Sequence, residues 1–141
     1  MRSLFLTRKH SLFPPGHPGR SSSLNNLAVH LSFRYSELQE IDDLHRAIVH
    51  NQEALSLRPP GHPGCPMSLD NLTLHLSYRY DWLRGIDDLN EAIVVDQEVL
   101  SLCPSGHPDH PRLLNNLAFH LCCQYSHLGG IDGLDEAIVL D

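Results

Sequence analysis

An internal repeat constrains this chain more than any other feature of its sequence. The tripeptide Gly-His-Pro begins at Gly16, Gly61 and Gly106, so the motif returns every 45 residues. Shifting the 141-residue sequence by that step aligns three copies without a gap, and the third copy stops early. Such a period is typical of stacked supersecondary units that cannot bury their apolar faces alone. We divide the chain into a tail or remnant of a preceding helix and three copies: residues 1–13, 14–58, 59–103 and 104–141.

Each copy contains two segments with the apolar spacing of an amphipathic helix. In the first segment of copy one, one helix face carries Leu24, Leu27, Ala28, Leu31 and Tyr35, and the other copies repeat this pattern. Proline and glycine in the Gly-His-Pro loop separate the copies. The sequence therefore predicts an all-α fold, an α-solenoid of antiparallel helix pairs. The expected helices cover residues 22–38, 43–57, 67–83, 88–102 and 112–128.

The second helix of each copy has two further recurring features. A small residue in its middle predicts a close helix crossing, at Ala47, Ala92 and Ala137. Aspartates near its start offer acceptors to the unpaired N–H groups of the first turn. We expect helix capping by Asp42-Asp43, Asp87-Asp88 and Asp132, with Asp88 and Glu91 forming a capping box.

Charge and cysteine content exclude several classes of protein. The formal net charge is −7, which argues against nucleic-acid or anionic-membrane surfaces because both need concentrated Lys and Arg. No apolar run reaches the length of a membrane span. The four cysteines form no CxxC pair, so we expect reduced thiols in an intracellular, cytoplasmic protein. No acidic residue precedes Glu37, which leaves a targeting role for the N-terminus open.

The helices resemble those of the tetratricopeptide repeat (TPR) family. The segment DLHRAIVHNQEALSLRP is similar to that family's second helix. The segment LNNLAVHL is similar to its first helix, with Leu24, Ala28 and Leu31 at the positions of the family's Trp, Gly and Tyr. The long period, and the His-Pro that precedes LNNLA, resemble kinesin-light-chain-type repeats as in arrays from mushroom-forming (basidiomycete) fungi. The resemblance implies a superhelical α-solenoid of three repeats that binds another protein or peptide and needs no cofactor.

A second apolar strip runs along the first helices, opposite the face expected to be buried. A helix side facing solvent should be charged, but this strip is apolar and has an Asn in every copy. The resemblance implies that first helices line a concave groove and that the Asn binds the backbone of an extended peptide. Alternatively, the Asn side chains join helices to neighbouring loops. The candidate peptide-binding residues are Asn25, Asn26, Val29, Phe33, Asn71, Leu74, Tyr78, Arg112, Asn115, Asn116 and Phe119.

Other chemistries are disfavoured by the same repeat. At the positions where the family grips a peptide carboxylate, only Arg112 is basic and Asp70 has the wrong sign, which favours an apolar or neutral segment. Histidine recurs at two positions in each copy, but equivalent residues on stacked helices lie about 10 Å apart and cannot converge on zinc. We expect the loop histidines to make structural hydrogen bonds. Every prominent polar group recurs from copy to copy, so we predict no metal site and no enzyme.

The leading functional hypothesis is a scaffold that holds an extended or helical segment of another protein in its groove. The alternative is a structural spacer within a larger multidomain array that carries a sensor or effector domain. Copy three lacks the second half of its second helix, which would leave the face from Leu114 to Tyr125 uncovered. We therefore expect fraying at residues 1–13 and 130–141 and end-to-end self-association.

Overall fold

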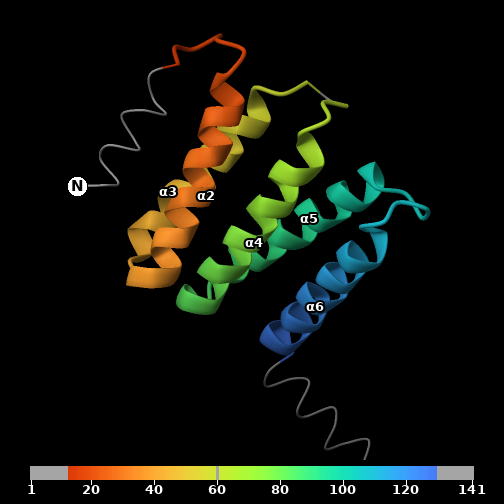
Figure 1. The fold of residues 1–141 in the computed structure, drawn as a ribbon. Coiled ribbons are helices and arrows are strands. Elements are labelled where there is room, and N and C mark those ends of the chain that lie inside the picture. The colour runs from red at the N-terminus through yellow and green to blue at the C-terminus, as the bar shows by residue number, and fades with distance from the viewer. Residues whose placement is uncertain (1–12, 60, 130–141) are drawn as a thin grey trace, which may run out of the picture.

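A computed structural model describes residues 13–59 and 61–129, and their only regular elements are α-helices (Figure 1). The predicted all-helical class is confirmed. Each helix begins two residues before its predicted start and ends within one residue of its predicted end. The helices are α2 (Arg20–Leu38), α3 (Ile41–Ser56), α4 (Cys65–Leu83), α5 (Ile86–Leu102) and α6 (His110–Leu128).

The loop histidines explain how α2, α4 and α6 begin. The Nδ1 atom of His17 accepts a hydrogen bond from the backbone N–H of Gly19 at 2.9 Å. His62 and His107 accept in the same way from the residues two positions ahead, at 2.9 and 3.1 Å. Each ring thus satisfies a backbone N–H next to the start of a helix, where partners inside the helix are missing. The expected structural role of the loop histidines is confirmed.

The starts of α3 and α5 correct the predicted capping. Their N-cap residues are Glu40 and Gly85, and neither helix has a side-chain capping bond. The expected capping by the Asp42-Asp43 and Asp87-Asp88 pairs, including the box of Asp88 with Glu91, is wrong. The second aspartate of each pair lies in the first turn of its helix and is buried against an arginine of the preceding helix. Asp43 pairs with Arg34 at 2.9 Å, and Asp88 pairs with Arg79 at 2.6 Å.

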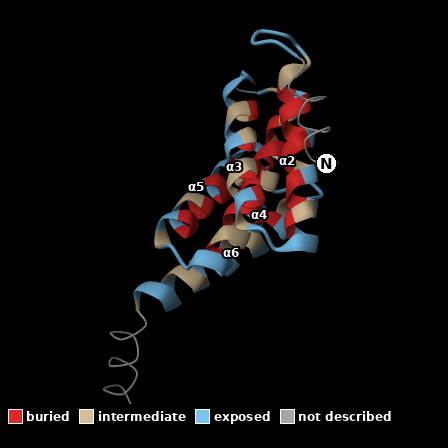
Figure 2. Ribbon diagram, turned by 90° about the vertical axis from the view of Figure 1, so that its left-hand side faces the viewer, coloured by how far each residue is buried: buried red, intermediate tan, exposed pale blue. Residues whose placement is uncertain are grey.

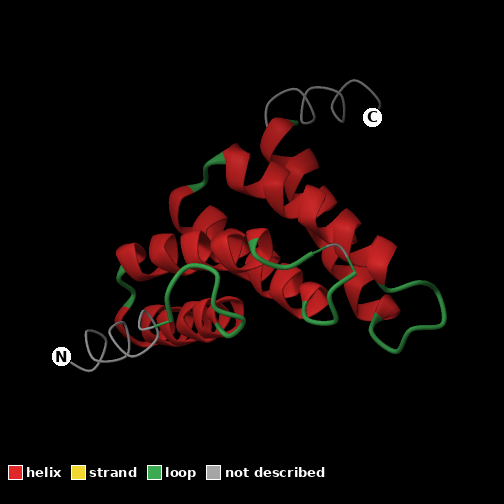
Figure 3. Ribbon diagram, turned by 90° about the horizontal axis from the view of Figure 1, so that it is seen from above, coloured by secondary structure: helices red, strands yellow, loops and turns green. Residues whose placement is uncertain are grey.

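Each helix packs on the next one along the chain, and loops join them at alternating ends (Figures 1 and 3). The largest apolar cluster joins residues of all five helices, from Tyr35 on α2 through Ile48 on α3 and Leu72 on α4 to Val99 on α5 and Leu113 on α6. Ala47 and Ala92 are fully buried, as expected for a close crossing. Packing of this kind, between neighbours in sequence, is consistent with a helical repeat.

The helix α6 is far less covered than its sequence equivalents α2 and α4 (Figure 2). Leu76 on α4 is completely buried, whereas Leu121, one 45-residue step later, is 42% exposed. Tyr80 and Tyr125 differ in the same way. The apolar face of α6 is therefore open, as the sequence predicted for copy three. The expectations for Asp132, Ala137 and the fraying of residues 130–141, and those for residues 1–12, fall outside the described residues.

Two further properties of the described residues concern membrane spans and disulfides. None of their helices has both the length and the apolar character needed to cross a membrane. All four cysteines lie in the described part of the chain, and none of them forms a disulfide.

Candidate binding groove between α4 and α6

A groove with a volume of about 330 Å³ lies between α4 and α6. The wall on α4 spans residues 70–77, and the wall on α6 spans residues 112–120. The residues lining it are Asp70, Asn71, Thr73, Leu74, Ser77, Arg112, Asn116, Phe119 and His120. Five of the predicted binding residues are among them: Asn71, Leu74, Arg112, Asn116 and Phe119.

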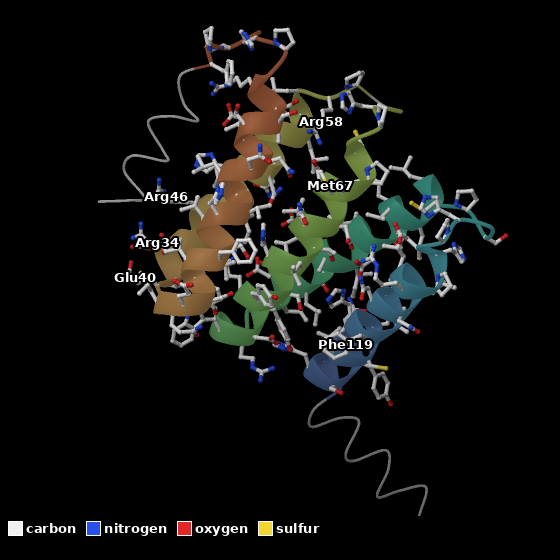
Figure 4. The ribbon with its side chains drawn as sticks, in the orientation of Figure 1. Arg34, Glu40, Arg46, Arg58, Met67 and Phe119 are labelled. Carbon is white, nitrogen blue, oxygen red and sulfur yellow. The ribbon has the colours of Figure 1, made fainter. Side chains whose placement is uncertain are left out.

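The two walls present the same chemistry because they come from equivalent positions of two sequence copies. Asn71 and Asn116 are one 45-residue step apart, and both amides are half-buried. Leu74 and Phe119 are related by the same step, and both are exposed large apolar side chains. Phe119 can be located on α6 in Figure 4. The groove therefore offers two amides and two apolar surfaces in a repeated arrangement.

A second hollow of about 490 Å³ continues from Phe119 toward the C-terminal ends of the same two helices. It is lined by Tyr80, Arg84, Phe119, Cys122, Cys123, Ser126 and His127. The hydroxyl of Tyr80 is 2.9 Å from His127 Nδ1, and the Arg84 guanidinium lies 5.5 Å from the centre of the Tyr80 ring. The contact of Tyr80 with His127 connects α4 to α6 at the far end of the groove.

One of the two thiols that line this hollow, that of Cys123, is not activated. Burial raises the pKa of Cys123, and the Asp81 carboxylate acts in the same direction. A reactive cysteine needs the opposite shift, because the thiolate is the nucleophile.

The charges at the other end of the groove neutralise one another. Arg112 on α6 forms an ion pair with Asp70 on α4 at 2.8 Å and lies 3.8 Å from Asp109. An arginine already placed between two carboxylates has little charge to offer a ligand carboxylate. This geometry supports the sequence argument against a carboxylate grip and agrees with an apolar or neutral ligand.

The floor of the groove contains a buried polar contact from α5. The Asp96 carboxylate accepts a hydrogen bond from the Thr73 hydroxyl at 2.7 Å, and its other oxygen contacts His120 Nδ1. Thr73 and His120 line opposite walls of the groove, and Asp96 lies beneath both of them. A carboxylate can only accept hydrogen bonds, so both partners must donate and His120 carries its proton on Nδ1.

The predicted residue Asn25 is a packing residue, which corrects its assignment to a binding surface. It is buried, and its amide oxygen accepts hydrogen bonds from Asn51 Nδ2 at 3.1 Å and from the Ser68 hydroxyl at 3.3 Å. Asn51 also contacts His75 Nδ1 at 2.5 Å, so one buried polar network connects α2, α3 and α4. This network holds three neighbouring helices together.

The other predicted residues lie outside the groove. Asn26 and Phe33 are exposed on α2, and Val29 is half-buried on the same helix. Tyr78 packs beside Tyr35, with ring centroids 6.2 Å apart, and so belongs to the contact between α2 and α4. Asn115 is exposed on α6 and does not line the groove.

Several groove residues escaped the sequence analysis. Thr73 is buried, as predicted, and it also lies on the groove wall. His120 is one of the recurring helix histidines, for which the sequence excludes a shared zinc site but predicts no structural role. A signal was present in the departures from the repeat. Copy two has Thr73 where the other copies have Ala28 and Ala118, and Asp96 where copy one has Asn51.

The groove contains no arrangement suited to a metal ion. Within residues 13–59 and 61–129, no cluster of three or more His, Cys, Asp or Glu side chains could hold one. No family model, curated protein or solved structure matches this chain.

Proposed function

We propose that this protein is a scaffold that binds an extended segment of another protein in the groove between α4 and α6. The observation that carries the proposal is the repeated lining of the two walls. Asn71 and Asn116 place an amide on each wall, and Leu74 and Phe119 place an exposed apolar surface beside each amide. Exposed apolar side chains bordered by polar groups are typical of interaction sites.

The dimensions and chemistry of the groove suit a short peptide. From Asp70 to Arg84 the helix α4 rises by about 21 Å, which an extended chain of about six residues would span. Amides can both donate to and accept from a peptide backbone, while the apolar surfaces cover alternate side chains. The ion pair of Arg112 with Asp70 leaves this end without a free charge for an acidic ligand.

We further propose that the helices form an α-solenoid of three TPR-like repeats. Support comes from contacts that recur at the 45-residue step. The loop histidines His17, His62 and His107 make the same bond in each copy. The buried pair of Arg34 with Asp43 recurs as Arg79 with Asp88. In such an array the first helices face a common concave surface, where the groove between α4 and α6 lies.

Selection from a displayed library of random 12-residue peptides tests this function. We expect the wild-type chain to select peptides with a shared apolar, neutral core. Phe119→Glu should abolish their binding, because it places a charge between the two hollows. Asn71→Ala should weaken binding by about 1–3 kcal/mol, the cost of an unpaired peptide group, and leave the melting temperature nearly unchanged.

The matched control is Val94→Glu. Val94 is 61% exposed on α5 and Phe119 is 59% exposed on α6, so the two changes introduce the same charge at equal exposure. Binding should survive Val94→Glu. Failure to select any peptide with the folded wild-type chain would instead favour a structural spacer, and equal effects of the two substitutions would place the binding surface elsewhere.

A further inference from the structure

Asp96 contacts both walls of the groove although it does not line the groove itself. It comes from α5, is only 3% exposed, and binds Thr73 on α4 and His120 on α6. One short side chain therefore joins the three helices that form the groove and its floor. Because a carboxylate has only a single rotatable bond beyond Cβ, its two oxygens fix how far apart their donors lie.

The equivalent junction between α2 and α4 shows that this bridge is a recurring device with adjustable chemistry. Asn51 on α3 occupies the position of Asp96, and it contacts Asn25 on α2 and His75 on α4. Asn25 accepts a hydrogen bond and His75 donates one, so the bridging residue must both donate and accept, as an amide does. Beneath the groove both partners donate, and the bridging residue is a carboxylate. The residue type thus follows the partners.

Few side chains of α6 are buried, and His120 is one of them. Only Leu113 and His120 are buried on α6, whereas nine residues are buried on α2 and eight on α4. Leu113 fixes the first turn of the helix, and His120 is the buried contact at its middle, beside Phe119 and the groove. Without the bond to Asp96, this part of the wall would lack its principal buried attachment.

We propose that Asp96 is the positioning residue of the groove, which sets the separation of its α4 and α6 walls and thereby its fit to the ligand. Its effect on ligand binding rests on the proposed function, whereas its effect on α6 does not. Asp96 acts through Thr73 and His120 and makes no contact with the ligand.

Three substitutions separate the length, the charge and the acceptors of this side chain. Asp96→Asn keeps the length, because its oxygen can accept from His120 while its NH₂ group donates to the Thr73 hydroxyl. Asp96→Glu keeps both acceptors and adds one methylene. Asp96→Ala removes the bridge. Peptides selected by the wild-type chain are titrated against each variant at a temperature where that variant is fully folded by circular dichroism.

We expect Asp96→Asn to bind within about threefold of wild type, and Asp96→Glu and Asp96→Ala to bind at least tenfold more weakly. Amide hydrogen exchange in the absence of peptide should be faster around His120 in the Glu and Ala variants, with α2 unchanged. If Asp96→Ala does not fold, Asp96→Glu decides the question. Unchanged peptide affinity and unchanged exchange in Asp96→Glu would overturn the proposal and leave the proposed function standing. If no peptide is selected, exchange alone decides whether Asp96 positions α6.

Discussion

Substituting equivalent leucines in α4 and α6 tests whether the apolar face of α6 is less buried than that of α4. Leu76 and Leu121 are one 45-residue step apart, and they are 0% and 42% exposed. Truncating a buried leucine to alanine removes about 2 kcal/mol of transfer free energy and leaves a cavity, for a total of about 2–5 kcal/mol. Leu121 is already partly exposed, so its truncation loses only about half of this transfer free energy and forms no closed cavity. We therefore expect Leu121→Ala to lower the free energy of unfolding by about 1 kcal/mol. Helix propensity cancels because both changes are Leu→Ala inside a helix.

Urea unfolding followed by circular dichroism measures both free energies of unfolding. We expect Leu76→Ala to lower this free energy by at least 1 kcal/mol more than Leu121→Ala does. Measurements at two protein concentrations separate folding from self-association, because only association makes stability depend on concentration. Equal losses for the two variants at both concentrations would refute the reasoning, since they would mean that the α6 face is as well covered as the α4 face.

Three further substitutions give expected outcomes from burial and from close contact. Burial lowers the pKa of His75 to about 4, below the unfolded value of about 6.5, so the unfolded chain binds the proton first. The contribution of neutral His75 to the free energy of unfolding is therefore intact above pH 6.5, and about 3 kcal/mol of it should be lost as the pH falls to 4. His75→Gln should flatten this dependence of the free energy of unfolding on pH, and an unchanged dependence would contradict the assignment. Gly64→Ala would place Cβ 2.7 Å from Arg58 Nη1 and should destabilise by about 1–3 kcal/mol. Gly85→Ala meets no atom within 4 Å and should change stability by less than about 0.5 kcal/mol, and equal effects in urea unfolding would exclude the clash.

The helices could be predicted from the sequence because their signals are local and occur in every copy. The apolar spacing of Leu24, Leu27 and Leu31 identifies the buried face of α2, and these residues are buried. The helices α3 and α5 begin two residues before the starts that capping by the aspartates predicts. In the structure, Asp43 instead pairs with Arg34 on the preceding helix. A cap and a buried ion pair require the same residue types near the start of a helix, and only tertiary packing decides between them.

The groove could be predicted only in part, because a repeat describes what its copies share. The shared positions of Asn71 and Phe119 were identified, and both line the groove. The same reasoning failed at Asn25, which is buried against Asn51. Its equivalents differ: Asp70 lies in the groove, and Asn115 is exposed outside it. One sequence position thus has three environments, which depend on the neighbours that cover it.

The departures from the repeat are more informative because they occur in matched pairs. Where copy one has Ala28 and Asn51, copy two has Thr73 and Asp96, which are in contact. The added hydroxyl donor thus occurs together with a residue that only accepts. Asn25 on α2 and Met67 on α4 are the equivalents, one 45-residue step earlier, of Asp70 on α4 and Arg112 on α6. Only Asp70 and Arg112 are oppositely charged, and these two form an ion pair. Truncating one member of either pair would leave the other without this contact, at a cost of about 1–3 kcal/mol where the group is buried. The first pair joins α4 to α5 beneath the groove, and the second joins α4 to α6, so the chain departs from its repeat where the groove is built.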